Sequence, residues 1–136
     1  RALMRAGVHG NLQIMLPMIS CIDEVRETRE IIAGLQRQMS AAGVPFAANI
    51  PLGVMIETPA AALIAGSLAK EADFFSIGTN DLIQYTIAVD RTNERVGHLY
   101  RPGHPAVIAL IKNAVGDAER ETIPVSLCGK TAEDNR

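Results

Sequence analysis

Short apolar runs alternate with helix-like stretches along this chain, and that alternation limits its possible folds more than any other feature. The apolar runs occupy residues 12–18, 52–56, 74–77 and 124–127. A continuous apolar run of this length indicates a strand buried on both faces, as in a parallel sheet. The connections between the runs are long enough for right-handed crossovers. The pattern therefore predicts an α/β fold built from parallel (β/α) units.

Helix signals fill the first two connections. In the first, Ser20 is the expected N-cap and Asp23 completes a capping-box pattern. An apolar stripe with helical spacing follows, formed by Val25, Thr28, Ile32, Leu35 and Met39. In the second connection, Thr58 can cap a helix whose first position is Pro59, and the Ala- and Leu-rich residues 60–70 continue it.

The later connections also predict helices. Residues 78–81, with the sequence GTND, are typical of a turn, and a helix is expected over residues 82–89. His104 and Pro105 open a further helix. Its expected inward positions are Val107, Leu110, Ile111, Ala114 and Val115.

Composition is that of one ordinary globular domain. The chain has 136 residues, of which 48% are hydrophobic and 21% charged. Its 13 basic and 15 acidic residues give a net charge of −2, so charge offers no reason to expect nucleic acid or an anionic membrane as partner. No apolar run approaches the roughly 18 residues of a membrane span. Two cysteines, Cys21 and Cys128, indicate a reducing compartment, and we expect a cytoplasmic protein.

Polar residues follow three of the four predicted strands. Glu57 follows the second, Asn80 and Asp81 follow the third, and Cys128 follows the fourth. The carboxyl ends of parallel strands form the edge at which ligands bind, both in open α/β sheets and in TIM barrels. The sequence therefore predicts a candidate site at this edge.

Glu57 and Asp81 lie on neighbouring strands if the strand order follows the sequence. Two carboxylates on one edge suit Mg²⁺, which takes one or two carboxylates and completes its shell with water and substrate oxygens. Alternatively, both side chains are solvated loop acids or helix caps. The spacing leaves both interpretations open.

Three further residues have one structural and one functional interpretation each. Asn80 either holds the turn or binds a phosphate. Arg91 either pairs with Asp90 or Glu94 on the surface or places its planar guanidinium on a phosphate or carboxylate. Cys128 is either a small buried apolar residue or a thiol that donates a proton near neutral pH. Together the functional interpretations suggest phosphoryl chemistry on a small enolate-type substrate.

The remaining cysteine and the histidines are expected to be structural. Cys21 is predicted to pack at a helix start. His9, His98 and His104 lack metal-ligand spacing and are predicted to lie on the surface or in turns.

Two longer segments carry a resemblance to a known family. GVMIETPAA, which contains Glu57, and FFSIGTNDLIQYTIAVDR, residues 74–91, resemble enzyme I of the phosphoenolpyruvate (PEP)-dependent sugar phosphotransferase system. NLQIMLPM, HLYRPGHPAVIALIK and PVSLCG also match, so the resemblance covers essentially the whole chain. GTNDL followed by QYT and AVDR favours enzyme I over pyruvate phosphate dikinase and PEP synthase, which share the more general parts.

The resemblance implies a PEP-binding TIM barrel and a role for each candidate residue. Glu57 and Asp81 match the Mg²⁺ ligands of the family. Asn80 and Arg91 match groups that bind PEP, together with Asp81. Cys128 matches the acid that protonates the enolate carbon and so yields pyruvate.

The resemblance also implies partners. The family transfers the phosphoryl group of PEP to a histidine on a separate domain, which passes it to the histidine phosphocarrier protein. The barrel domain of the family also forms a homodimer. We therefore expect PEP and pyruvate as ligands, the phosphocarrier as partner of the full-length enzyme, and no membrane insertion.

The chain departs from the family pattern in length and at one position. A TIM barrel has eight strands and about 250 residues, whereas four strands are expected here. Residues 1–136 are therefore expected to be about half of a barrel, a fragment with two exposed sheet edges that is inactive by itself. Lys130 stands where the family has a glutamate two residues after the cysteine, and a lysine there could lower the pKa of the thiol.

Two alternatives to an enzyme I segment stay open. One is a segment of a dikinase or synthase of the same superfamily. The other is a non-catalytic module that binds PEP or mediates dimerisation, which Lys130 and the missing strands favour.

Overall fold

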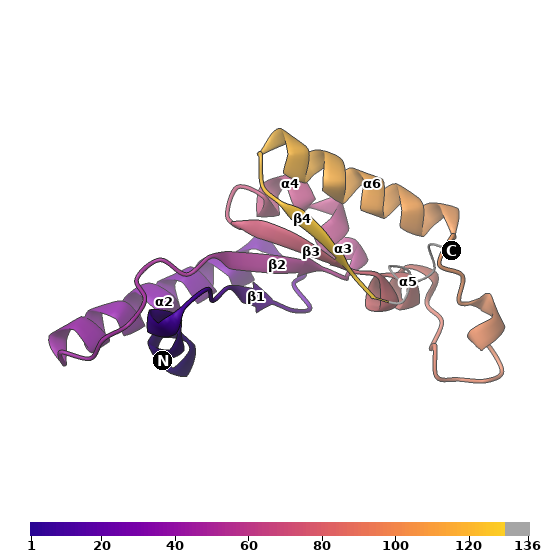
Figure 1. The fold of residues 1–136 in the computed structure, drawn as a ribbon. Helices are drawn as coiled ribbons and strands as arrows, with labels where there is room; N and C mark the ends of the chain where they lie inside the picture. The colour runs from indigo at the N-terminus through magenta and orange to yellow at the C-terminus, as the bar shows by residue number, and fades with distance from the viewer. Residues whose placement is uncertain (130–136) are drawn as a thin grey trace.

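Four parallel strands form one sheet whose spatial order is the order of the sequence (Figure 1). In the computed structural model, which describes residues 1–129, they are β1 (Ile14–Leu16), β2 (Leu52–Ile56), β3 (Phe74–Gly78) and β4 (Val125–Cys128). Every neighbouring pair is parallel. The predicted α/β fold of parallel units is confirmed, and β1 and β4 are the two edges of the sheet.

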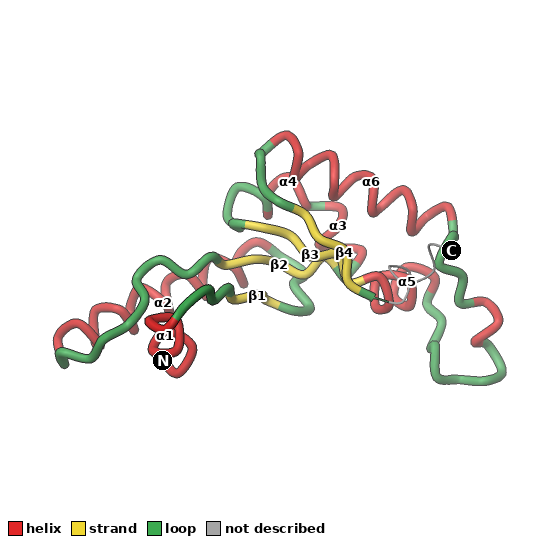
Figure 2. Tube along the Cα trace, in the orientation of Figure 1, coloured by secondary structure: helices red, strands yellow, loops and turns green. Residues whose placement is uncertain are grey.

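Helices connect the strands, as Figure 2 shows. The chain begins with α1 (Ala2–Ala6) and a 3₁₀ turn, η1 (Gly7–His9). The later helices are α2 (Ile22–Ala41), α3 (Pro59–Leu63), α4 (Ala65–Leu68), α5 (Thr79–Ile87), the 3₁₀ turn η2 (Gly97–Leu99) and α6 (Pro105–Arg120). Helices α3, α4 and α6 pack together over one face of the sheet (Figure 1).

The hydrophobic core lies between the sheet and these helices. Successive strand residues point to opposite faces, so alternate residues of β2 and β3 enter the core. The strand residues of the hydrophobic core are Leu52, Val54, Ile56, Phe75 and Ile77. Helices α3, α4 and α6 contribute small or aliphatic side chains, namely Ala61, Ala62, Ala65, Leu68, Val107, Ala114 and Ala118. The predicted inward stripe of residues 105–120 is confirmed, because Val107 and Ala114 are buried and Leu110, Ile111 and Val115 pack against the core.

The first apolar run was predicted to be a strand buried on both faces, and this is wrong. Only Ile14–Leu16 form strand β1, and Met15 is 39% exposed. The physical reason is position: β1 is an edge strand with a single neighbour, β2. Continuous apolar character alone does not distinguish an edge strand from a central one.

Helix boundaries differ from the prediction at three places. Thr58 caps α3 as expected, since its hydroxyl accepts a hydrogen bond from the Ala61 N–H at 3.0 Å, but the helix breaks at Ile64. The predicted GTND turn is wrong, because Thr79 already begins α5. The N-cap of α2 is Cys21 rather than Ser20, and Glu24 rather than Asp23 closes the cap.

The cap of α2 uses one carboxylate for two backbone donors. Glu24 Oε2 accepts hydrogen bonds from the N–H groups of Ser20 at 2.7 Å and Cys21 at 3.0 Å. The bond from Ser20, followed by that from Cys21, lowers the pKa of Glu24 below its usual value. Cys21 itself is exposed, so its predicted packing role is wrong.

The histidines behave as predicted. His9 and His98 are exposed. His104 caps α6, because its Nδ1 accepts a hydrogen bond from the Ala106 N–H at 3.2 Å. Within residues 1–129, no helix is both long enough and apolar enough to cross a bilayer.

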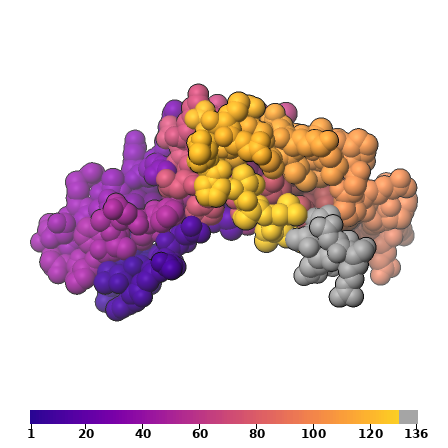
Figure 3. All heavy atoms as spheres, turned by 45° about the horizontal axis from the view of Figure 1, so that its top comes forward, coloured from indigo at the N-terminus to yellow at the C-terminus, as the bar shows by residue number. Residues whose placement is uncertain are grey.

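Different elements form the two ends of the molecule. In the space-filling view, α2 and the amino-terminal residues form one end, and the segment between α5 and α6 forms the other (Figure 3). The strands point with their carboxyl ends toward the second end, where α5 begins (Figure 1). The predicted site residues are at this end of the sheet.

Candidate active site at the carboxyl edge of the sheet

Glu57 is a buried carboxylate at the end of β2, only 5% exposed. Its Oε1 accepts a hydrogen bond from the backbone N–H of Met18, in the β1–α2 loop, at 2.8 Å. The other side of the carboxylate lies against Gly78. A Cβ atom on Gly78 would be 2.8 Å from Glu57 Cβ and 2.9 Å from its Oε2. Glycine at position 78 therefore makes room for the Glu57 side chain.

Asp81 lies in the first turn of α5, the helix that Gly78 caps. Its Oδ1 lies 3.4 Å from Nη1 of Arg91. Arg91 reaches back because α5 ends at Ala88, whose left-handed backbone turns the chain. The surface interpretation of Arg91, a pair with Asp90 or Glu94, is wrong among the described residues: its partner is Asp81. The ion pair places both predicted residues at one end of β3.

Asn80 is hydrogen-bonded to Tyr100, a residue of the segment between α5 and α6. Its backbone carbonyl accepts a hydrogen bond from the Tyr100 hydroxyl at 3.1 Å. Burial raises the pKa of the Tyr100 phenol above its usual value, and the charge of Arg91 acts in the opposite direction. The sequence does not predict a role for Tyr100, whose only signal is the HLY triplet at residues 98–100.

Cys128 is the last residue of β4 and lies opposite Gly78 in the strand register. Its side chain is exposed, so a buried packing role is wrong. Its backbone carbonyl accepts a hydrogen bond from the Thr79 hydroxyl at 3.2 Å, which ties β4 to the first residue of α5. Lys130 lies outside the described residues.

These contacts give the order of the groups along the edge. Glu57 lies next to Gly78, and Gly78 lies next to Cys128. Asp81 and Asn80 begin the helix that grows from Gly78, and Arg91 returns to Asp81. The amino end of α5 adds the positive end of a helix dipole, which favours an anion.

The donor set fits a hard divalent cation that shares its shell with substrate. Residues 1–129 contain no group of three or more His, Cys, Asp or Glu side chains able to hold a metal ion. Glu57 and Asp81 supply two carboxylates on neighbouring strand ends, which is the usual protein share of a Mg²⁺ shell. A metal that needs a full protein cage, such as structural zinc, does not fit.

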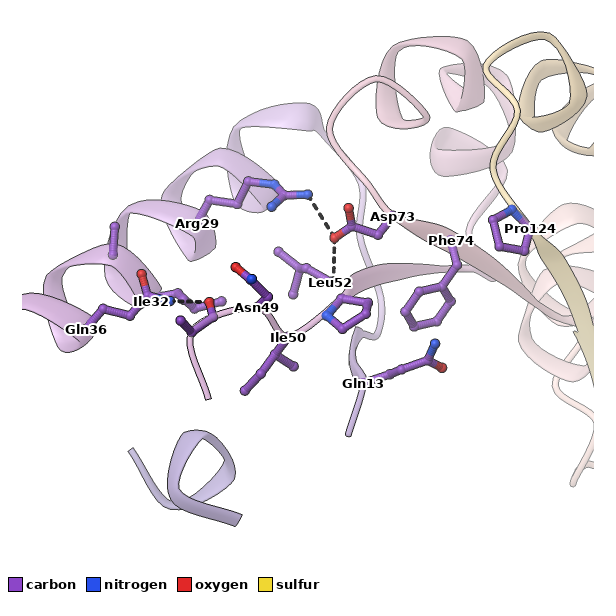
Figure 4. A pocket seen from close by; sticks show the side chains of 13 residues that line it. Gln13, Arg29, Ile32, Gln36, Asn49, Ile50, Leu52, Asp73, Phe74 and Pro124 are labelled. Atoms are coloured by element: carbon purple, nitrogen blue, oxygen red, sulfur yellow. Dashed lines mark hydrogen bonds and ion pairs between the residues drawn. The ribbon is translucent and has the colours of Figure 1, made fainter. Parts of the chain in front are cut away.

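A cavity of about 600 Å³ lies at the opposite, amino-terminal edge of the sheet (Figure 4). Its two charged side chains are paired with each other: Arg29 Nη2 lies 3.2 Å from Asp73 Oδ2, which also accepts the Leu52 N–H at 2.7 Å. Arg29 also donates to the Glu71 carbonyl. No sequence pattern predicts a role for these residues. They connect α2 to the starts of β2 and β3 and have a structural role.

A family model describes the same region in other proteins. The model for the PEP-binding domain of PEP-utilising enzymes matches residues 1–136. Among curated proteins, the chain is 50% identical over 134 residues to the phosphoenolpyruvate-protein phosphotransferase of Listeria monocytogenes, and 52% identical to that of Geobacillus stearothermophilus. In both cases the match covers 98% of this chain and 23% of the relative.

A solved structure supports the fold independently. The citrate lyase of Burkholderia xenovorans aligns with 90% of this chain at a TM-score of 0.61 and 19% identity. The alignment covers 37% of the citrate lyase chain, whose fold is of the TIM-barrel type. A likeness at this identity concerns the fold alone, and it confirms the prediction of a partial barrel.

Proposed function

Because this chain belongs to the family of PEP-utilising enzymes with this PEP-binding domain, we propose that it forms the PEP-binding half barrel of a PEP-protein phosphotransferase. Two relatives that are 50% and 52% identical to the chain are named phosphoenolpyruvate-protein phosphotransferase. The chain spans about a quarter of their length, 23%. The further strands of the barrel and the phosphoryl-accepting histidine are proposed to lie on other parts of the protein.

One observation supports the proposal above the others: the five candidate residues follow the ends of β2, β3 and β4 at one edge of the sheet. Glu57 lies against Gly78, Cys128 is the register partner of Gly78, and Arg91 is paired with Asp81. A solvated loop acid has no reason to be buried. Glu57 in particular is buried at 5% exposure and accepts a backbone hydrogen bond.

We propose that Glu57 and Asp81 hold Mg²⁺. When bound, the ion would neutralise charge on the phosphate and carboxylate oxygens of PEP. Arg91 would exchange its contact with Asp81 for the phosphate, whose oxygens match the planar guanidinium. Asn80, in the first turn of α5, would bind PEP alongside the helix dipole.

The proposed reaction ends with a proton transfer from Cys128. The phosphorus–oxygen bond of PEP breaks, the phosphoryl group passes to a histidine of a separate domain, and the electron pair stays on the enolate oxygen. The enolate carbon then takes the thiol proton of Cys128, which gives pyruvate, and solvent returns a proton to the thiolate. The exposed position of Cys128 allows that last exchange.

The proposed cellular setting follows the family. We propose a cytoplasmic homodimer that passes its phosphoryl group to the histidine phosphocarrier protein. No nucleic acid partner is proposed, in line with the net charge of −2.

Calorimetry of PEP binding to the intact protein, with Mg²⁺ and with EDTA, tests the proposal. We expect binding that requires Mg²⁺ and is lost in Glu57→Gln, together with transfer of labelled phosphate from PEP to a histidine. Binding without transfer would favour a non-catalytic PEP-binding module. Transfer that requires a nucleotide and a second phosphate would favour a dikinase, and absence of PEP binding would contradict the proposal.

A further inference from the structure

We infer that Met18 is a positioning residue whose left-handed backbone directs an N–H group at Glu57 and fixes the orientation of that carboxylate. Met18 has φ 54°, and its N–H donates to Glu57 Oε1 at 2.8 Å. The inference rests on the proposed function, in which the carboxylate of Glu57 binds a metal ion.

The conformation of Met18 is unusual for its surroundings. Two other non-glycine residues among the described ones have positive φ, Ala88 and Thr122. Both follow the last turn of a helix, where the left-handed conformation is an ordinary way to end it. Met18 ends no helix, since it lies between β1 and α2. A residue with a Cβ atom is disfavoured there, so its surroundings must impose the conformation.

The junction between β2 and α3 imposes it through two consecutive side chains. Glu57 accepts the Met18 N–H, and the Thr58 hydroxyl donates to the Ile19 carbonyl at 2.7 Å. Ile19 is 5% exposed and anchors the loop in the core. The β1–α2 loop thus donates one hydrogen bond to the β2–α3 junction and accepts another from it.

The side chain of Met18 contributes little to this arrangement. It is 47% exposed, so the backbone N–H is the part of the residue that the site uses. On its other side, the Glu57 carboxylate is confined by Gly78, where a Cβ would come within 2.9 Å of Oε2. Glu57 is therefore fixed between one donor on the β1–α2 loop and the end of β3. Fixing a metal ligand before the metal arrives raises affinity, because the side chain loses less conformational freedom on binding.

Substitutions that change backbone preference test this role. In the intact protein, Met18→Gly keeps the N–H and accepts positive φ, so we expect Mn²⁺ affinity within about twofold of wild type. Met18→Ile places a β-branched residue where it is strongly disfavoured, and we expect affinity to fall about 10- to 100-fold. Met15→Ile is the matched control, because Met15 is also partly exposed but lies in strand β1, where isoleucine is favoured.

An NMR comparison without metal separates the two proposals. With ¹⁵N-methionine labelling, we expect the Met18 amide to be protected from hydrogen exchange in wild type and to lose that protection in Glu57→Leu, which removes the acceptor. Equal protection of the Met18 amide in these two proteins, equal Mn²⁺ affinity in Met18→Ile and wild type, or equal losses of affinity in Met18→Gly and Met18→Ile would overturn the inference. If wild type binds no Mn²⁺ while the protection of the Met18 amide still depends on Glu57, the metal site fails and the hydrogen-bonding role of Met18 stands.

Discussion

Arg91 Nη1 lies 3.4 Å from Asp81 Oδ1, so the cation proposed for the phosphate and a carboxylate proposed for Mg²⁺ neutralise each other. The two side chains are 40% and 31% exposed. An ion pair with this exposure contributes roughly 0–1 kcal/mol to stability. Arg91 can therefore leave Asp81 for a phosphate at little energetic cost, and Asp81 then becomes available to a metal. When PEP and Mg²⁺ bind at the proposed site, each member of this ion pair would therefore exchange the other for a new partner.

Arg91→Gln should weaken PEP binding much more than it weakens the fold. Hydrogen bonds to charged groups contribute about 1.5–3 kcal/mol each, so we expect about a 10- to 100-fold rise in the Kd for PEP with Mg²⁺ present. The change in unfolding free energy should stay below about 1 kcal/mol. Calorimetry and urea unfolding measure the two quantities.

Arg95→Gln is the matched control for Arg91→Gln. It removes the same charge from the same exposed segment, but the Arg95 side chain has no ion pair among the described residues. Its Kd for PEP should stay within about twofold of wild type at physiological ionic strength. Equal effects of the two variants would mean that the segment acts through its net charge and that Arg91 has no specific contact with PEP.

Gly78→Ala should displace the Glu57 side chain without removing any titratable group. The new Cβ would lie 2.8 Å from Glu57 Cβ and 3.0 Å from Met55 Sδ, so the carboxylate must move. We expect a stability loss of about 1–3 kcal/mol and Mn²⁺ affinity lower by about 10-fold or more. Gly103→Ala is the control, since a Cβ there meets nothing within 4 Å. Matching Mn²⁺ affinities in the two variants would show that Glu57 is not a ligand.

Much of the fold and the edge that carries the site follow from the sequence because both depend on local pattern. Buried strands such as Leu52–Ile56 need apolar residues, and parallel strands bring their carboxyl ends together. That is sufficient to gather Glu57, Asp81 and Cys128 at one edge. The edge position of β1 is different, because it depends on which strands are neighbours and not on the residues of the strand itself.

The contacts that shape the site depend on backbone geometry and on distant partners. Methionine has no preference for positive φ, so nothing in the sequence predicts the backbone of Met18. The pairing of Arg91 with Asp81 requires the chain to reverse at Ala88, a residue that is not typical of turns. The bond from Tyr100 to Asn80 spans a segment without regular periodicity.

Tyr100→Phe should change how stability depends on alkaline pH. Burial raises the pKa of Tyr100 in the folded protein above its ordinary value of 10.0. At a pH between 10.0 and the folded-state pKa, the folded protein therefore binds more protons than the unfolded chain. Stability from this group is complete below pH 10 and is lost as pH rises through the folded-state pKa. At pH 8 the variant should be less stable by about 0.5–1.5 kcal/mol, through loss of the bond to Asn80.

Urea unfolding at pH 8 and above pH 10 measures this dependence. The stability difference between wild type and Tyr100→Phe should narrow as pH rises above 10, because only wild type loses the contribution of the neutral phenol. Tyr85→Phe serves as the control, since Tyr85 is 46% exposed. A difference that stays constant with pH would contradict the assignment to Tyr100.

Cys128→Ser should separate substrate binding from turnover. The thiol is at the end of β4, opposite Gly78, and is proposed to give its proton to the enolate carbon after the phosphoryl group has left. A serine hydroxyl is a much weaker acid, so pyruvate formation should slow by about 10²- to 10⁴-fold, the usual share of general acid catalysis. The Kd for PEP should change little, because the proposed contacts with phosphate and metal lie on other residues.

Cys21→Ser is the matched control, because Cys21 is also exposed but caps α2 in the β1–α2 loop. Wild-type turnover in Cys128→Ser, or equal slowing in both variants, would remove Cys128 from the reaction.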